Sequence, residues 1–459
     1  MNQFMNPIFL FRILKGHLID VNRIWRNDID QLRRYQDKSI RKIVNYAYTV
    51  PLYHKKYKEY NVHPDDIKGI KDIHKLPLIS KEDIRDNYPD GIIPKGYNKE
   101  KDFILSTSGS TGKPLFIYCD LYTIIRYTEG FVRTLKAYGG NWRKTKILLI
   151  IDMKPGSIEH AAFTSSISPF IKKFVPMNNL KYLHVGEKSE SLIKQINEFN
   201  PEILGSDPPV LMKMAFLKNQ GLGKDINLKS LFSAGSMLDK YTRLYVEKAF
   251  NAKILDTYGT TEAGPVAFEN PEGDGYHVHS DFVYMEFLDD DQKPVPYGKP
   301  GHLAITRLYG KGTPIIRYTG LEDLITPIEP RTYNGMTTEM IKYIGGRSLE
   351  LIHTPDGRMI SPFHVTTIPA SVMNDFNSYK INQFQIIQHK VDKIEVKVII
   401  DEKLRNIGPS VKEILDEIIK RFQDVTSKDV EIVINEVDEI EKDVRLDLVR
   451  LVVTKLKRP

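Results

Sequence analysis

The residues best suited to chemistry form one run of small hydroxyl and glycine residues that ends in a lysine. The run is Ser106, Thr107, Ser108, Gly109, Ser110, Thr111, Gly112 and Lys113, followed by Pro114. Glycine lets a backbone approach a polyphosphate closely, while turn amides and hydroxyl groups offer hydrogen-bond donors and lysine adds positive charge. The run therefore indicates a phosphate-binding loop, although by itself it also fits a surface hairpin of small residues.

The sequence on either side separates this loop from a Walker P-loop. Residues 103–105 and 115–119 are apolar and predict a strand before and a strand after the loop. A Walker loop has a glycine five residues before its Gly-Lys pair, Ser or Thr after that pair, and a helix to follow. This chain has Thr107 and Pro114 at those two positions, so we exclude a Walker loop.

Composition excludes several other classes of protein. A chain of 459 residues predicts about two to three domains. The net charge of +7 is small for this length, and basic and aromatic residues do not interleave, so we expect no nucleic-acid partner. The single cysteine, Cys119, excludes a disulfide framework and Cys-rich metal sites, fits a reducing compartment and, within an apolar run, indicates a packed and inert thiol.

No run reaches the roughly 18 apolar residues that a spanning helix needs, so we expect no membrane span and a cytoplasmic protein. The apolar residues 7–14 predict a short amphipathic helix packed on its own domain; a membrane surface or a partner subunit is the alternative. The sequence leaves a monomer and a homodimer both open.

Short apolar runs alternate with helical patterns through most of the chain. Residues 15–90 read as helices broken by Pro51 and Pro77, and residues 100–330 as α/β layers around a largely parallel sheet. The clearest elements are a strand at 147–151 and helices at 189–199 and 240–250. Residues 276–327 are β-rich, with strands predicted at 283–288, 302–306 and 314–318.

A smaller α+β domain is predicted to begin near Gly345 and Gly346. Its pattern gives strands at 384–388, 394–400 and 430–434, a helix at 410–422, and then a charged helix to Pro459. The predicted fold class is α/β, with a large N-terminal domain of layered sheets (1–344) that includes a β-rich subdomain, and a small, mobile α+β domain (345–459).

Two further motifs follow the loop in a fixed order. The first is Ser233, Ala234, Gly235 and Ser236, and the second is Asp256, Thr257, Tyr258, Gly259, Thr260, Thr261 and Glu262. Together with the loop they resemble the adenylate-forming superfamily, which includes acyl-CoA synthetases and peptide-synthetase adenylation domains. The resemblance implies that the first motif lines adenine, that Tyr258 stacks on adenine, that Thr261 touches a phosphate and that Glu262 holds Mg²⁺.

Three stretches resemble one branch of that superfamily more narrowly, the phenylacetate–CoA ligase branch with its capsular-polysaccharide-type relatives. Residues 44–53 and 76–85 are similar to the N-terminal helices of that branch, and residues 314–318 to the run that precedes its ribose-binding Asp. This chain is one residue longer at that point, so we choose Asp323 for the ribose, with Glu322 as a competitor. Arg347 matches the arginine of the hinge and is expected to contact ribose or phosphate, while Leu349 stands where the hinge Asp is usual.

Some members of this branch carry a Cys/His zinc site directly after the Tyr258–Glu262 motif. The matching residues here include acids and no cysteine, so we expect no structural zinc. His277 and His279 share one strand face, which is compatible with a metal pair and more typical of hydrogen-bonded or solvent-facing histidines.

The catalytic lysine that the family places near its C-terminus matches Lys442, with Arg445 at the usual spacing and Glu441 in place of glycine. A lysine there would neutralise charge between the carboxylate nucleophile and the α-phosphate; a solvated charge on a terminal helix is the alternative. The resemblance implies an enzyme that uses ATP, Mg²⁺ and coenzyme A to activate a small carboxylic acid. We expect residues 130–260 to line the acid pocket, with Tyr138, His160 and Phe163 as candidates.

Two other functions fit the same motifs. One is transfer of AMP to an acceptor that is not a thiol. The other is a non-catalytic nucleotide-binding protein of a surface-polysaccharide system, which the departures at Asp323, Leu349 and Glu441 suggest.

Overall fold

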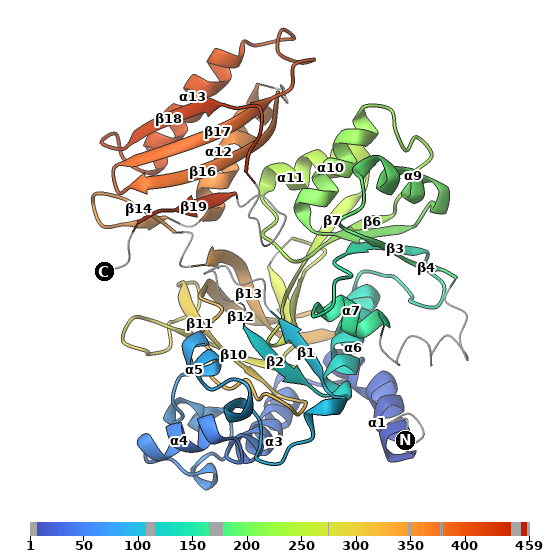
Figure 1. Cartoon of the computed structure of the whole chain (residues 1–459), viewed down its shortest axis with the longest axis vertical. Coiled ribbons are helices and arrows are strands. Elements are labelled where there is room, and N and C mark those ends of the chain that lie inside the picture. The colour runs from blue at the N-terminus through green and yellow to red at the C-terminus, as the bar shows by residue number, and fades with distance from the viewer. Residues whose placement is uncertain are drawn as a thin grey trace.

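The computed structural model describes residues 7–106, 115–164, 178–273, 275–347, 351–360, 362–376, 378, 380–441 and 451–456. Figure 1 shows a large body that contains the elements up to β13 and a smaller body that contains β14 to β19 in orange and red. Three of the predicted features, residues 107–114, Leu349 and Lys442, lie outside the described residues.

Helices make up the N-terminal part of the large domain, as the sequence predicts. They are α1 (Pro7–Lys15), η2 (Gly16–Asp20), α2 (Arg23–Arg26), α3 (Ile29–Ala47), α4 (Pro51–Glu59), η3 (Pro64–Asp66), η4 (Ile70–Lys75), α5 (Lys81–Asp86), η5 (Asp90–Ile92) and η6 (Lys99–Lys101). Pro51 occupies the first position of α4, where its missing N–H costs no helical hydrogen bond. Capping boxes at Asp28 and Ser80 start α3 and α5, because each side chain satisfies an otherwise unpaired backbone donor.

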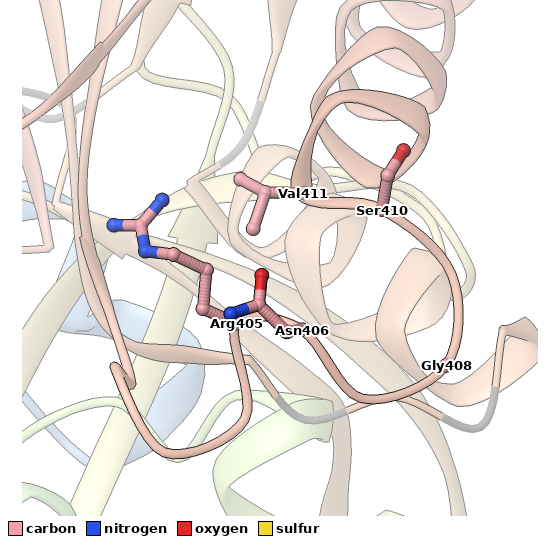
Figure 2. A pocket seen from close by; sticks show the side chains of 5 residues that line it. All are labelled: Arg405, Asn406, Gly408, Ser410 and Val411. Atoms are coloured by element: carbon pink, nitrogen blue, oxygen red, sulfur yellow. The ribbon is translucent and has the colours of Figure 1, made fainter.

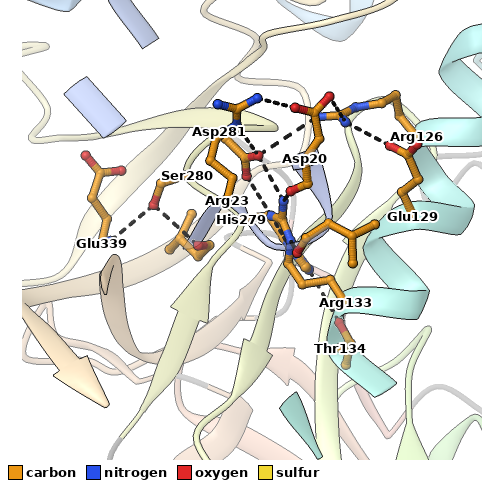
Figure 3. A network of polar contacts seen from close by, with 12 residues as sticks. Asp20, Arg23, Arg126, Glu129, Arg133, Thr134, His279, Ser280, Asp281 and Glu339 are labelled. Atoms are coloured by element: carbon orange, nitrogen blue, oxygen red, sulfur yellow. Dashed lines mark hydrogen bonds and ion pairs between the residues drawn. The ribbon is translucent and has the colours of Figure 1, made fainter. Parts of the chain in front are cut away.

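A buried ionic network fixes the first of these helices to the rest of the domain (Figure 3). Arg133 of α6 (Leu121–Ala137) donates two hydrogen bonds to Asp281, at 2.6 and 2.9 Å, and one to the carbonyl oxygen of Asp20 at 2.5 Å. Arg126, two turns earlier on the same face of α6, bonds to Asp20 at 3.0 Å and to Glu129 at 2.8 Å. We call these five residues the ionic anchor.

One mixed sheet forms the centre of the large domain, in the order β10-β11-β12-β13-β9-β8-β7-β6-β5-β3-β4. Its strands are β3 (Ile147–Ile151), β4 (Leu180–His184), β5 (Ile203–Ser206), β6 (Ser230–Ser233), β7 (Lys253–Thr260), β8 (Gly264–Glu269), β9 (Tyr276–Val278), β10 (Val283–Leu288), β11 (Gly301–Arg307), β12 (Asp323–Tyr333) and β13 (Met336–Arg347). The β-rich region predicted for residues 276–327 therefore continues the parallel sheet.

Strand β7 joins the two halves of this sheet. Its first residues pair in parallel with β6, up to the register pair Ser233 and Asp256. From Thr257 onward it pairs antiparallel with β8. The Asp256–Glu262 motif thus begins where the sheet changes direction, and such a switch point is where α/β sheets open a crevice for ligands.

Helices cover both faces of the parallel half. α9 (Ser189–Phe199), α10 (Pro208–Asn219) and α11 (Lys240–Phe250) pack on the face that carries Leu148 and Ile150, while α6 packs on the face that carries Ile147 and Leu149. Both faces are apolar because β3 is buried on both sides, which explains its unbroken apolar run. A separate hairpin, β1 (Phe103–Ser106) and β2 (Phe116–Cys119), flanks residues 107–114 and confirms the predicted strand before and strand after.

The small domain has its own four-stranded sheet, in the order β18-β17-β16-β19, and its own core. Its elements are β14 (Ile352–His353), β15 (Met359–Ile360), α12 (Pro362–Asp375), β16 (Ile381–Lys390), β17 (Lys393–Ile400), α13 (Val411–Val425), β18 (Glu431–Glu436) and β19 (Val452–Thr454). Tyr241 of α11 packs into that core, and its hydroxyl bonds to the carbonyl oxygen of Ile381 at 3.4 Å. The domain boundary stays a prediction; β13 continues in the large sheet to Arg347.

Two predicted elements are wrong. Residues 314–318 do not form a strand: Pro314 has no N–H to donate, Arg317 has a φ of 47°, and only Tyr318 makes isolated bridges to Ile79 and Ile305. The charged helix predicted up to Pro459 is contradicted by β19, which pairs in parallel with β16. The apolar run at 451–453 was too short to outweigh the surrounding charges in the sequence pattern.

Candidate nucleotide-binding site

The predicted adenine motif and the Asp256–Glu262 motif lie side by side at the carboxyl ends of the parallel strands. Ser206 and Ser233 end β5 and β6, and their register partner Asp256 is the residue of β7 at which its parallel pairing ends. Ala234 donates its N–H to the carbonyl oxygen of Ser206 at 3.2 Å, and Gly235 then turns with a φ of 90°, a conformation that side chains disfavour. The two motifs together form one edge of the crevice.

Asp256 is buried at this edge and is held by neighbours that the sequence did not indicate. Its Oδ2 accepts a hydrogen bond from the Tyr276 hydroxyl at 2.8 Å, and its N–H donates to Glu269 Oε2 at 2.8 Å. Glu269 in turn forms a bidentate ion pair with Arg243, at 3.0 and 2.9 Å. Burial raises the pKa of Asp256 to about 6, because a low-dielectric surrounding disfavours the charged carboxylate.

Three side chains donate hydrogen bonds to consecutive backbone carbonyl groups of the tight turn after β7. The Tyr127 hydroxyl donates to the carbonyl oxygen of Thr261 at 3.2 Å, Arg307 to that of Glu262 at 2.9 Å, and the Tyr309 hydroxyl to that of Ala263 at 3.2 Å. All three donors are buried. We call Tyr127, Arg307 and Tyr309 the carbonyl clamp; it fixes the backbone that presents Glu262.

Two tyrosine–carboxylate hydrogen bonds cross between this turn and the segment before β12. The Tyr258 hydroxyl bonds to Asp323 Oδ2 at 2.5 Å, and the Tyr318 hydroxyl bonds to Glu262 Oε1 at 3.1 Å. Each of the two segments thus supplies a tyrosine whose hydroxyl bonds to a carboxylate of the other segment. The predicted adenine, ribose and magnesium residues are thereby brought together.

The segment that carries Tyr318 is supported by the N-terminal helices. Ile79 donates to the carbonyl oxygen of Arg317 at 3.0 Å and accepts from Thr319 at 2.9 Å. The Tyr53 hydroxyl bonds to the carbonyl oxygen of Pro314 at 2.7 Å. The stretches around residues 44–53, 76–85 and 314–318, which resemble one branch of the superfamily, therefore form a single contacting unit.

Asp323 and Arg347 are register partners on β12 and β13, which places the backbones of both predicted ribose contacts together; the Arg347 side chain lies outside the described part of the chain. Glu322, the competitor of Asp323, occupies a turn with a φ of 58°. The contact with Tyr258 favours Asp323, whose role stays a prediction.

Residues predicted for the phosphate loop and the acid pocket are only partly described. Ser106 donates its N–H to the carbonyl oxygen of Gly156 at 3.0 Å, so the loop begins beside α7 (Ile158–Thr164). The backbone N–H of His160 donates to the Ser157 hydroxyl at 2.9 Å, as expected of a helix start. Tyr138 packs against Phe232, and its hydroxyl bonds to the carbonyl oxygen of Asp256 at 3.1 Å. The side chain of Phe163 lies outside the described residues.

The chemistry of Glu262 fits a magnesium ion bound together with a nucleotide. Mg²⁺ is commonly held by one or two carboxylates, with phosphate oxygens and water as its other ligands. Within the described ranges no group of three or more His, Cys, Asp or Glu side chains forms a metal site. His277 bonds to Thr338 at 2.8 Å and His279 to Arg133 at 3.2 Å, so both are buried and hydrogen-bonded.

A depression of about 440 Å³ lies in the small domain, away from these motifs (Figure 2). It is lined by Arg405, Asn406, Gly408, Ser410 and Val411. Arg405 pairs with Glu402 and Glu436, and Ser410 caps α13, so these contacts account for the loop without a ligand.

Known proteins are similar to this chain over most of its length. A family model described as the CapK C-terminal domain matches residues 352–445. The phenylacetate-coenzyme A ligase of Pseudomonas putida is 28% identical over 386 residues, which are 81% of this chain and 82% of that protein. Protein CapK of Staphylococcus aureus is 26% identical over 353 residues, 75% of this chain and 73% of that protein.

Solved structures agree on the fold. A 2-hydroxyisobutyryl-CoA ligase in its postadenylation state has a TM-score of 0.78 at 19% identity and covers 93% of this chain and 90% of its own. The same ligase in its thioesterification state has a TM-score of 0.62. Both structures share the fold of this chain.

The fold is that of acyl-CoA ligases, and the likeness to phenylacetate-coenzyme A ligases supports an ATP-dependent, AMP-forming acid–thiol ligase. Its sequence relatives are phenylacetate–CoA ligases and CapK, and its small domain matches the CapK C-terminal model, so the chain is similar to that branch. Among the described residues no helix has the length and apolar content needed to cross a membrane.

The carbonyl clamp and the Arg243–Glu269 pair were missed by sequence reasoning. The one available signal was Arg307 itself, a charged residue at the end of an apolar strand. Nothing local connects it with Glu262, which is 45 residues earlier in the chain.

Proposed function

We propose that this protein activates a small carboxylic acid with MgATP and then transfers the acyl group to coenzyme A. In the first step a carboxylate oxygen attacks the α-phosphorus and pyrophosphate leaves, which gives an acyl-adenylate. In the second step the thiol attacks the acyl carbon and AMP leaves. The crossed Tyr258–Asp323 and Tyr318–Glu262 contacts carry this proposal, because they join the residues for adenine, ribose and metal in one site.

The nucleotide is proposed to lie along the carboxyl ends of β6 and β7. Tyr258 offers its ring to adenine while its hydroxyl orients Asp323 toward the ribose diol. Ser106 begins the phosphate loop, and the loop residues up to Lys113 supply donors for the β- and γ-phosphates. Magnesium, when bound, offsets charge on the leaving pyrophosphate, and Glu262, whose backbone the carbonyl clamp fixes, is the residue that holds it.

Lys442 is proposed to approach the α-phosphate from the small domain in the first step. We also propose that the small domain moves before the thiol enters. The packing of Tyr241 in the small-domain core is the contact that such a movement would have to break.

Pyrophosphate exchange tests the first step directly. Purified protein is incubated with ATP, Mg²⁺ and labelled pyrophosphate, with phenylacetate and 2-hydroxyisobutyrate first and then with other aryl, fatty and amino acids. Glu262→Gln should lower exchange about 100-fold, since it removes a charge that the transition state needs. Glu202→Gln, at the opposite end of the same parallel strands, is the matched control and should exchange like the wild type.

Coenzyme A tests the second step. We expect acyl-CoA only when the thiol is present, while exchange continues without it. Transfer of AMP to an acceptor other than a thiol would overturn the proposed second step, and ATP binding without exchange for any acid would overturn the first. We also propose a cytoplasmic location, which cell fractionation tests.

A further inference from the structure

The Glu262 carboxylate lies inside the protein and has one defined tyrosine partner. Its residue is 3% exposed, and Oε1 accepts a hydrogen bond from the Tyr318 hydroxyl at 3.1 Å. Burying a carboxylate is costly unless donors or a cation compensate it. The orientation of this carboxylate therefore depends on the groups that contact it, and Tyr318 is one of them.

Tyr318 is held more rigidly than its place in an irregular segment suggests. It exchanges two backbone hydrogen bonds with Ile305 of β11, at 2.9 and 3.0 Å, and is fully buried. Gly320 makes room for the ring: a Cβ at that position would lie 2.4 Å from the Tyr318 hydroxyl. The hydroxyl therefore has a single position, and that position is next to Glu262.

The backbone of Glu262 is fixed by other residues. The carbonyl clamp holds the carbonyl groups of Thr261, Glu262 and Ala263 in sequence. The orientation of the side chain depends on its own contacts, and the Tyr318 hydroxyl bonds to one of the oxygens at its end. Burial, together with the neighbouring Glu262, holds the pKa of Tyr318 far above its usual value, so the hydroxyl remains a donor.

We infer that Tyr318 is a positioning residue that aims the Glu262 carboxylate at the magnesium–triphosphate complex. This inference rests on the proposed function, because it assumes that Glu262 is the carboxylate that meets the metal. Removing the hydroxyl would leave the carboxylate charge in place and release its orientation. Partners that orient a metal ligand commonly change metal affinity about 10- to 100-fold when lost.

The test measures metal binding without turnover. Mn²⁺ replaces Mg²⁺, and the spectrum of bound Mn²⁺ is recorded by electron paramagnetic resonance with a non-hydrolysable ATP analogue. We expect Tyr318→Phe to weaken Mn²⁺–nucleotide binding about tenfold. Tyr57→Phe removes the hydroxyl of another fully buried tyrosine, on α4, and should leave Mn²⁺ binding unchanged.

A second variant distinguishes loss of the hydrogen bond from misfolding. Gly320→Ala keeps the hydroxyl and displaces it, so it should weaken Mn²⁺ binding in the same direction. Unchanged Mn²⁺ affinity in folded Tyr318→Phe or Gly320→Ala would overturn the inference, even if thermal stability fell. Failure of the wild type to bind Mn²⁺ with nucleotide would instead overturn the proposed function, so the two failures are distinguishable.

Discussion

Two regions of this protein bury arginine side chains, and they stabilise the positive charge in different ways. In the ionic anchor, Arg126 and Arg133 face the carboxylates of Asp20, Glu129 and Asp281 (Figure 3). In the carbonyl clamp, Arg307 donates to the carbonyl oxygens of Glu262 and Thr313, at 2.9 and 2.7 Å, and to the Tyr127 hydroxyl at 3.2 Å. Among the described residues no carboxylate lies within ion-pair distance of Arg307.

The ionic anchor connects segments that are distant from one another in the sequence. Burial disfavours a charged Asp281, yet Arg133 and Arg126 bring the pKa of this carboxyl below its usual value. Both arginines also stack on the Phe282 ring, at 4.1 and 4.4 Å from its centre. Because the arginines and carboxylates of this region pair with one another inside the protein, we assign the region to stability.

Within the carbonyl clamp, the positive charge of Arg307 lies next to the turn that carries Glu262. Carbonyl oxygens stabilise a guanidinium through their dipoles and leave its net charge uncompensated. A buried, uncompensated cation raises the positive potential at the phosphate end of the site. The same residue type thus serves folding in one region and, by our proposal, nucleotide binding in the other.

The largest expected effect breaks the ionic anchor. Arg133→Met leaves the buried Asp281 without its bidentate partner and should lower the free energy of unfolding by about 3–5 kcal/mol. Pyrophosphate exchange per folded molecule should stay at the wild-type level. Urea denaturation followed by circular dichroism measures the first quantity and the exchange assay the second. Arg34→Met, at an exposed arginine, is the control and should change stability by less than about 0.5 kcal/mol.

The same substitution at the other arginine should give the reverse pattern. Arg307→Met removes the donor to Glu262 and should lower exchange about 10- to 100-fold, a loss that matches one or two hydrogen bonds from a charged donor. The free energy of unfolding should fall by only about 1–3 kcal/mol, since no carboxylate is left unpaired. If Arg307→Met loses as much stability as Arg133→Met and keeps its exchange rate, the contrast between the regions is wrong.

The smallest effect concerns pH beside the ionic anchor. Burial lowers the pKa of His277 to about 4, while an unfolded histidine titrates near 6.5. The unfolded chain therefore takes up this proton first, so His277 contributes full stability above about pH 6.5 and loses it as pH falls toward about 4. In His277→Asn, the stability deficit relative to wild type should shrink by about 1 kcal/mol per pH unit below pH 6.5.

Denaturation of both proteins at pH 7, 6 and 5 measures this change. A deficit that is constant across the series would mean that His277 does not titrate differently in the folded protein. Comparison with wild type at each pH is essential, because burial raises the pKa of Glu129 and Glu339 to about 7 and shifts stability in the opposite direction.

Local sequence patterns predicted most of the elements that form the sheet and its cover. The unbroken apolar run of β3 and the amphipathic repeats of α9 and α11 have the bounds that the sequence indicated. These predictions were confirmed because a fully buried strand is apolar along its length, and a helix with one buried face repeats apolar residues at helical spacing. The strand predicted for residues 314–318 was wrong, because a short apolar run does not show that Pro314 and Arg317 prevent regular strand pairing.

The sequence by itself determined the class of the protein, since the order of its motifs resembles one superfamily and one branch of it. It also indicated which acids and aromatic residues belong to the site, because their spacing within each motif is local. Only the tertiary structure decided how the motifs meet: Tyr258 with Asp323, Tyr318 with Glu262, and Arg307 behind both. The physical reason is separation along the chain. Hydrogen bonds between residues 45 to 65 positions apart depend on how strands are ordered in the sheet, and no local pattern records that order.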